Sequence, residues 1–147
     1  MPSTDAVISY LHKHHPPDSF SRRLMRLVYL CDWKSCLMHG RRMLYLDWVN
    51  TCNGPLSLDV RKAPPPRVMP SASLTEEDRD VLDFVLAFSA KRQSTDAQFS
   101  LTVRSTYPLI TTSCGTSLDL LPLSQEYLER RGLLFDTFRD LSPPTPS

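Results

Sequence analysis

The spacing of hydrophobic residues predicts helices over most of the chain. In residues 4–15, apolar side chains recur on one face of a short amphipathic helix, which the two prolines after it should end. A second helix follows and should stop at Gly40, because glycine readily adopts the left-handed conformation that closes a helix. Between Leu24 and Trp33 this helix is apolar on nearly all sides, so we expect it at the centre of the core.

The pattern changes after the glycine stop. Residues 43–49 are rich in aromatic and branched side chains and form too short a run for a helix, which favours a small strand or hairpin. The Asn-Gly-Pro sequence at 53–55 predicts a tight turn, because Gly tolerates positive φ and Pro restricts the next φ. Ser57 can cap a brief helix over 58–62, and the prolines within 63–73 predict a surface linker.

Two further helices are predicted in the second half of the chain. Thr75 can cap the first, which carries acidic residues in its first turn and is the clearest amphipathic helix of the sequence. Ser94 or Thr95 can cap the second, which should end near Tyr107-Pro108, because the residue before a proline disfavours the helical conformation. We expect these two helices to form a hairpin.

The remaining segments add a loop, a last helix and a tail to a single predicted domain. Residues 111–118 have the composition of a loop, and residues 124–131 predict a last helix. Residues 136–147 are rich in proline and have little to bury, so they are expected to form a tail. The sequence therefore predicts one domain over residues 1–135, of the α+β class, predominantly α-helical with a small β-hairpin or short sheet.

Composition narrows the classes of function. The 147 residues are 41% hydrophobic and 22% charged, as in ordinary globular domains. A formal net charge of +1 gives no broad positive field, which disfavours nucleic acid as the partner. No run of about 18 apolar residues occurs, so neither a membrane-spanning helix nor a membrane partner is predicted.

The cysteines bear on the cellular compartment. None of the four stands in a CxxC spacing, and the chain opens without the basic segment and apolar stretch of a secretory signal. A reducing, cytoplasmic location is therefore predicted. The four residues are Cys31, Cys36, Cys52 and Cys114.

Candidate catalytic and metal-binding residues are few. His12, His14 and His15 lie close together in sequence, but a zinc site needs further ligands, and the prolines that follow break the helical spacing. Cys114 lies in a loop typical of nucleophiles, yet no base or orienting acid can be assigned to it. No GxGxxG, GxxxxGK[ST], HExxH or GxSxG motif occurs. We therefore predict no enzymatic activity, no metal and no cofactor.

Arginines and aromatics offer candidate binding residues. Arg22, Arg23 and Arg26 cluster at the start of the second helix and could contact phosphates, although a solvated helix face explains the same pattern. Four large aromatic residues, Tyr29, Trp33, Tyr45 and Trp48, are candidates for either core or interface positions.

One arrangement of residues resembles a known family. It comprises Leu27, Tyr29, Leu30, Asp32 and Trp33 on the second helix, then Gly40-Arg41, Trp48-Val49, Gly54-Pro55 and Asp59-Val60. This order resembles the SocA-like Panacea domain, which occurs in bacterial and phage antitoxins and in toxin-binding proteolytic adaptors. The helix after Thr75 and the stop at 106–108 are similar to the second half of that domain, so the resemblance covers about residues 1–130. Arg42, where many members have Pro, and the prolines at 64–66 depart from the pattern.

The resemblance implies a protein that binds a partner and catalyses no reaction. It implies an antitoxin that neutralises a cognate toxin by direct contact, in a bacterial or phage toxin–antitoxin pair. Two alternatives stay open: a proteolytic adaptor that delivers the toxin to a cytoplasmic protease, and a DNA-binding autoregulator that uses the arginines of the second helix. The predicted partner-binding residues are Trp33, Arg41, Arg42, Trp48, Asn53 and Pro55.

Overall fold

The computed structural model describes residues 2–63, 74–92 and 95–130. In chain order its elements are α1 (Thr4–His14), α2 (Pro17–His39), β1 (Trp48–Thr51), β2 (Gly54–Leu56), α3 (Leu58–Arg61), α4 (Glu76–Arg92), α5 (Asp96–Arg104), α6 (Tyr107–Thr111), β3 (Ser117–Leu118) and α7 (Leu120–Arg130). The predicted class is confirmed: the protein is α+β and mostly helical, with a small antiparallel sheet.

Some predictions concern residues beyond this described part. The linker predicted over 63–73 lies outside it except for Ala63, and the tail predicted at 136–147 lies outside it entirely. The limits of a single domain at 1–135 therefore stay a prediction. In the described helices, no segment combines the length and the apolar character that crossing a bilayer requires.

The first two helices begin and end where local chemistry favours it. Ser3 Oγ accepts a hydrogen bond from the N–H of Ala6 at 3.1 Å, which satisfies one of the free donors at the start of α1. α2 starts at Pro17, a position where the missing N–H of proline costs nothing. The helix stops at Gly40, whose φ of 65° is left-handed and whose N–H donates to the carbonyl of Cys36 at 3.1 Å, as predicted.

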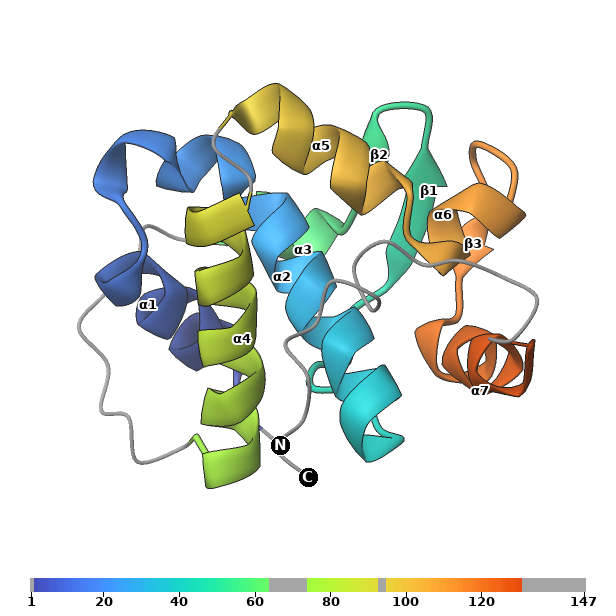
Figure 1. The fold of residues 1–147 in the computed structure, drawn as a ribbon, viewed down its shortest axis with the longest axis horizontal. Helices are drawn as coiled ribbons and strands as arrows, with labels where there is room; N and C mark the ends of the chain where they lie inside the picture. The colour runs from blue at the N-terminus through green and yellow to red at the C-terminus, as the bar shows by residue number, and fades with distance from the viewer. Residues whose placement is uncertain (1, 64–73, 93–94, 131–147) are drawn as a thin grey trace.

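α2 runs through the middle of the molecule (Figure 1), which confirms the position predicted from its apolar surface. It packs against α1, α4, α5, α7 and β2. Every residue from Leu27 to Cys36 is buried, including the charged side chains of Asp32 and Lys34. Charged residues at such positions need partners inside the protein, because water does not reach them.

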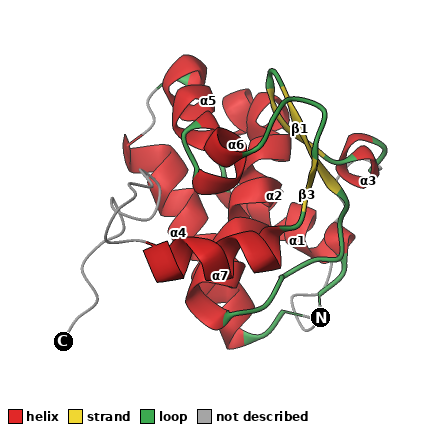
Figure 2. Ribbon diagram, turned by 90° about the vertical axis from the view of Figure 1, so that its right-hand side faces the viewer, coloured by secondary structure: helices red, strands yellow, loops and turns green. Residues whose placement is uncertain are grey.

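The sheet lies at one edge of the helical body (Figure 2). β1 is the central strand, with β2 and β3 antiparallel on either side. Val49 pairs with Leu56, and Trp48 pairs with Leu118, so the sheet joins the first half of the chain to the second. Pro55 is tolerated in β2 because this is an edge strand, where one side of the backbone has no ladder to complete.

Two details of this region differ from the sequence-based expectation. The predicted strand over 43–49 is wrong for residues 43–47, which form a loop that leads into β1. The turn lies at Cys52 and Asn53, one residue earlier than predicted, and Gly54 with φ of 124° already belongs to β2. The hydroxyl of Thr51 closes this turn by accepting from the N–H of Asn53 at 3.2 Å and donating to the carbonyl of Gly54 at 2.7 Å.

The predicted starts of α4 and α5 are confirmed. At α4, Thr75 Oγ1 accepts from the N–H of Asp78 and Asp78 Oδ2 accepts from the N–H of Thr75, both at 3.1 Å. At α5, Thr95 makes the same reciprocal arrangement with Gln98. In each case two backbone donors that the helix leaves free are satisfied by side chains.

The later elements begin and end differently from the prediction. α5 ends at Arg104, and the Tyr107-Pro108 sequence opens α6 instead of ending α5, because proline fits the first turn of a helix. The predicted loop at 111–118 contains β3, and α7 begins at Leu120 instead of residue 124. A strand of two residues carries no periodic pattern, so its pairing with β1 was not visible in the sequence.

A disulfide bond joins Cys52 in the β1–β2 turn to Cys114 in the loop between α6 and β3. Their Cα atoms are 5.3 Å apart, and 62 residues separate them in sequence. Both residues are exposed. Backbone hydrogen bonds support the same junction, since Asn50 N donates to the carbonyl of Thr116 at 2.9 Å and Gly115 N donates to that of Asn50 at 2.6 Å. The disulfide runs against the reducing compartment predicted from the cysteine spacing, because disulfides are rare in such compartments. Sequence spacing also says little about which distant loops meet.

Removal of this disulfide should lower stability. On the chain-entropy estimate, a cross-link that closes a loop of this length lowers the entropy of the unfolded chain and so raises the free energy of unfolding by about 4 kcal/mol. The double variant Cys52→Ser, Cys114→Ser should therefore unfold at a temperature roughly 10 °C lower than the native chain in circular dichroism melts. Dithiothreitol should lower the midpoint of the native chain similarly and leave the double variant unchanged. A native midpoint that does not respond to the reductant would contradict the prediction.

Candidate partner-binding site

Asp32 of α2 is the anchor of the region predicted to bind a partner. Its side chain is fully buried, and its carboxylate accepts four hydrogen bonds. Oδ1 accepts from the N–H groups of Met43 at 3.0 Å and Leu44 at 3.3 Å. Oδ2 accepts from Trp48 Nε1 at 3.0 Å and Arg42 Nη2 at 2.9 Å. A buried carboxylate is tolerated when an opposite charge and several donors surround it, and here both conditions are met.

These bonds fix the path of residues 40–47, which we name the 40–47 loop. Two more bonds tie down its ends: Ser35 Oγ donates to the carbonyl of Arg41 at 2.8 Å, and Arg42 Nη2 also donates to the carbonyl of Leu46. The loop is thus joined to α2 through both Ser35 and Asp32. A loop held in this way has already lost much of the conformational freedom that binding would otherwise remove.

The 40–47 loop turns some side chains inward and others to the solvent. Met43, Leu44 and Leu46 are buried, whereas Tyr45 is 82% exposed. Arg41 is exposed as well and forms an ion pair with Glu77 of α4. An exposed tyrosine on a fixed backbone offers an apolar ring and a polar hydroxyl that a partner could contact.

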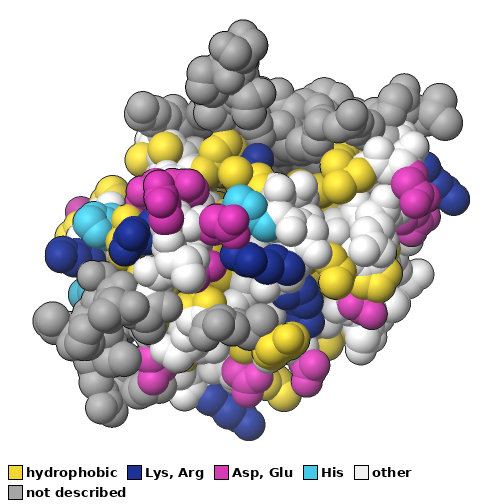
Figure 3. Space-filling model, turned by 90° about the horizontal axis from the view of Figure 1, so that it is seen from below, with side chains coloured by type: hydrophobic (Ala, Val, Ile, Leu, Met, Phe, Trp, Pro, Cys, Tyr) yellow, Lys and Arg dark blue, Asp and Glu magenta, His cyan; other side chains and the backbone are white. Residues whose placement is uncertain are grey.

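The end of the molecule around this loop has a mixed surface. Met38, in the last turn of α2, is 48% exposed. Figure 3, which views the molecule from below, shows hydrophobic side chains in separate groups among basic and acidic ones. Surfaces of this composition are typical of non-obligate protein interfaces, whose overall polarity resembles that of the remaining surface.

Three of the six predicted partner-binding residues are not at the surface, and the prediction is wrong for them. Trp33 is 0% exposed, and its ring lies 6.3 Å from that of Tyr127 on α7. Trp48 is 1% exposed, and its ring lies edge-on to Tyr29 at 5.6 Å. Pro55 is also buried. Both tryptophans are core residues, because the helices and sheet around α2 close over them.

The other three predicted residues occupy different settings. Arg42 is mostly buried and forms an ion pair with Asp32. Arg41 is exposed beside it on the 40–47 loop. Asn53 is exposed but lies in the β1–β2 turn, where its carbonyl accepts a long hydrogen bond of 3.4 Å from Arg26. The structure therefore brings Arg42 and Trp48 together at Asp32, with Arg41 next to them, and leaves Asn53 elsewhere.

The predicted set of partner-binding residues includes neither Asp32 nor Tyr45, although Tyr45 is among the aromatic candidates for core or interface positions. A signal for Asp32 exists, because an acidic residue within the most apolar part of a buried helix must find donors nearby. The identity of those donors depends on the backbone of the following loop. Tyr45 carries no such signal, since exposed and buried aromatics look the same in a short irregular segment.

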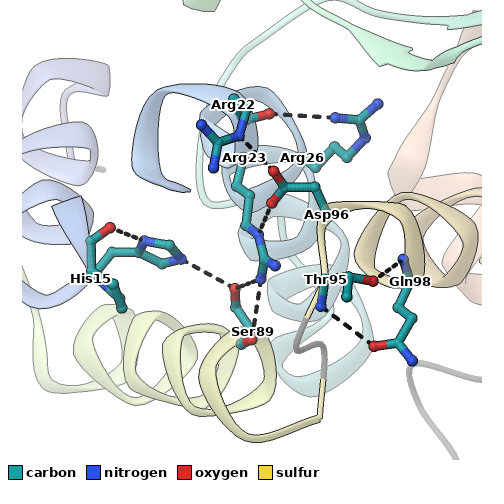
Figure 4. Close-up of polar contacts among 9 residues, drawn as sticks. His15, Arg22, Arg23, Arg26, Ser89, Thr95, Asp96 and Gln98 are labelled. Carbon is teal, nitrogen blue, oxygen red and sulfur yellow. Dashed lines mark hydrogen bonds and ion pairs between the residues drawn. The ribbon is translucent and has the colours of Figure 1, made fainter. Parts of the chain in front are cut away.

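The arginine cluster of α2 is largely engaged with Asp96 of α5 (Figure 4). Arg22 Nε donates to Asp96 Oδ2 at 2.5 Å, and Arg23 Nε donates to Oδ1 at 2.7 Å. These contacts with Arg23 and Arg22 hold the pKa of Asp96 below its usual value. Arg23 is buried, with its guanidinium 4.9 Å from the ring centroid of Phe99, so it is neither a phosphate contact nor part of a solvated face.

His15 extends this network to the junction of α1 and α2 (Figure 4). The carbonyl of Pro16 can only accept, so Nδ1 donates to it at 2.9 Å, and Nε2 lies 3.2 Å from the hydroxyl oxygen of Ser89. Ser89 Oγ also accepts from Arg23 Nη1 at 3.0 Å. A neutral imidazole accepts the hydroxyl proton of Ser89 at Nε2, whereas a protonated one donates to Ser89 Oγ. Burial and the nearby Arg23 lower the pKa of His15, although the bond to Pro16 and the charge of Asp96 oppose them.

Other chemistry has little support in the described residues. No group of three His, Cys, Asp or Glu side chains in this part of the chain is arranged to hold a metal ion. His15 is used structurally, as shown above. Cys114 is bonded to Cys52, so it offers no free thiol as a nucleophile. Burial raises the pKa of Cys36 to about 12, which leaves this thiol unreactive at neutral pH.

Comparison with known proteins finds no relative. No family model matches the chain, and no curated protein or solved structure is similar to it. The resemblance to the Panacea domain therefore stays a prediction that depends on the residues quoted for it.

Replacing Asp32 should destabilise the fold strongly. In Asp32→Asn the amide N–H₂ would face donors from Trp48 and Arg42, and the arginine would lose its counter-charge. Breaking a buried ion pair in this way costs about 3–5 kcal/mol in the free energy of unfolding, measurable by urea denaturation. Asp47→Asn, at an exposed position of the same loop, serves as the control and should change stability by less than about 0.5 kcal/mol. A loss below about 1 kcal/mol for Asp32→Asn would contradict the role assigned to it.

His15 should make stability fall in mild acid. Its pKa is lower in the folded protein than in the unfolded chain, where it is about 6.5. Below that pH the unfolded chain binds a proton that the folded protein resists, so the free energy of unfolding should decrease by at most about 1.4 kcal/mol per pH unit. Urea denaturation between pH 7 and pH 5 measures this slope. It should flatten in His15→Gln and persist in His14→Gln; equal slopes in all three proteins would refute the assignment.

Proposed function

We propose that this chain is an antitoxin that neutralises a cognate protein toxin by direct binding, and that the 40–47 loop is its principal contact surface. The proposal combines the resemblance to Panacea domains with one structural observation. That observation is Tyr45, which is 82% exposed on a loop whose backbone is bonded to the buried carboxylate of Asp32.

The energetics of binding support this surface. A tyrosine offers a large apolar ring and a hydroxyl, and it has few rotatable bonds to immobilise. When its backbone is already fixed, most of the area that it buries contributes to affinity. Aromatic residues of this kind, surrounded by polar groups, are the usual energetic centres of protein interfaces.

Neighbouring charges add specificity. Arg41, on the same loop as Tyr45, forms an exposed ion pair with Glu77 of α4, and Asp47 is exposed at the end of the loop. Exposed pairs contribute little to the stability of the fold. At an interface, however, they select partners of complementary charge and increase the rate of encounter. Inhibition would then require only that the complex cover the active site of the toxin.

The two alternative functions lead to different expectations. A proteolytic adaptor would shorten the lifetime of the toxin in cells, whereas an antitoxin that acts by blocking leaves toxin levels constant. A DNA-binding autoregulator would use the arginines of α2 and lose affinity steeply with salt. No contact among the described residues favours the adaptor over direct neutralisation, and Asp96 already engages two of the three arginines that the autoregulator would need.

Truncation of Tyr45 tests the contact surface. Cells that express the neighbouring reading frame should stop growing and should recover when the native chain is co-expressed. Tyr45→Ala should abolish recovery, because loss of a central aromatic weakens binding by about 2 kcal/mol or more, roughly 30-fold in Kd. The folded state should be unaffected, since the side chain makes few contacts.

The control is Leu101→Ala, which removes an apolar side chain that is 60% exposed on α5. It should rescue growth as the native chain does. If the neighbouring gene is harmless, the antitoxin function is wrong. If Tyr45→Ala rescues fully, the function stands and the surface is wrong. Toxin levels measured in the rescued cells distinguish blocking from delivery to a protease.

A further inference from the structure

A second surface feature lies far from the 40–47 loop, where Arg26 of α2 meets the β1–β2 turn. Arg26 Nη1 donates to the carbonyl of Arg22 and Nη2 to that of Asn53, each at 3.4 Å, the weak end of the hydrogen-bond range. Arg26 Nε is buried without a hydrogen-bond partner among the described residues. A Cβ on Gly54 would lie 3.9 Å from this atom, so the hairpin packs directly against it. The guanidinium is held in place, and each of its two Nη atoms has one N–H that makes no hydrogen bond among the described residues, whereas Nε is covered by the hairpin.

The charges around Arg26 are unbalanced. Arg22, Arg23, Arg26 and Arg104 are opposed by Asp96, which already pairs with the first two. Within residues 2–63, 74–92 and 95–130, no acidic side chain forms an ion pair with Arg26 or Arg104. Burial and then the nearby charge of Arg104 lower the pKa of Arg26, while Asp96 partly offsets them. Like charges held close together are stabilised by an anion between them.

We propose that Arg26 and Arg104 form a binding site for an oxyanion, the carboxylate or phosphate group of a ligand, with Arg22 at its edge. Guanidinium groups bind both kinds of oxyanion through two parallel N–H···O bonds, which are stronger than the long carbonyl contacts that Arg26 makes here. α5 packs against both α2 and β2, the two elements between which Arg26 lies, and Arg104 is in the last turn of α5. The β1–β2 turn holds Arg26 in position.

This site is independent of the proposed antitoxin surface. Arg26 and Gly40 are 14 residues apart on α2, which corresponds to about 20 Å of helix. Arg26 lies near the middle of α2, whereas the 40–47 loop follows its C-terminal end, so a variant at one should leave the other intact.

Titration with small anions tests the proposal. The full-length chain, labelled with ¹⁵N, is titrated with inorganic phosphate in one arm and acetate in the other, at constant ionic strength maintained with sodium chloride. The Nε–H signal of Arg26 should shift and saturate with at least one of the two anions. Saturation with phosphate alone assigns a phosphate ligand, saturation with acetate alone assigns a carboxylate, and saturation with both assigns a general oxyanion site.

Substitutions decide whether the response belongs to this site. Arg26→Gln should abolish saturable binding, and Arg104→Gln, at an exposed position, should weaken it about tenfold in Kd. Arg61→Gln on α3 removes an exposed arginine elsewhere and should leave the titration unchanged. The proposal is overturned if neither anion saturates the native chain, if Arg104→Gln binds as the native chain does, or if Arg61→Gln weakens binding equally. Because Arg104 is exposed, its variant keeps the test decisive even if Arg26→Gln does not fold.

Discussion

A single buried carboxylate constrains the region on which the proposed function depends. Asp32 lies in the most apolar part of the central helix, where an unpaired charge would be prohibitively costly. It is stable there because the chain after the helix returns and supplies two backbone N–H groups, an indole N–H and a guanidinium. The same four bonds therefore satisfy the charge and determine the path of the 40–47 loop. The local fold and the proposed binding surface therefore have one physical cause in this part of the molecule.

This constraint also explains the distribution of aromatic residues. Trp48 can donate to Asp32 only from inside the protein, so its ring enters the core and packs against Tyr29. Trp33, on the same buried part of α2, packs toward α7. Tyr45 lies between buried neighbours on a loop whose inward positions are already filled, and it faces the solvent. An aromatic residue is thereby presented on a rigid support, which is the property that the antitoxin proposal uses.

The arginines divide into those that the fold uses and those that it leaves available. Arg42 and Arg23 are largely buried and neutralise Asp32 and Asp96, and the pair of Arg23 with Asp96 connects elements far apart in sequence. Arg23 also belongs to the chain of hydrogen bonds through Ser89 to His15, which holds α2 and α4 together. Arg26 and Arg104 have no comparable acidic partner within the described residues. A net charge of +1 therefore conceals a local excess of positive charge between α2 and α5.

The sequence by itself determined the α+β class, the central position of α2, its end at Gly40 and the cap at Thr75, and it narrowed the cap of α5 to Ser94 or Thr95, because periodicity and capping act over a few residues. Only the tertiary structure decided that Trp33 and Trp48 are buried, that Cys52 pairs with Cys114, and that Asp32 organises the following loop. These outcomes depend on which distant segments meet. The type of a residue limits which contacts its side chain can make. The packing of the whole chain decides whether the side chain makes those contacts in the core or is exposed to a partner.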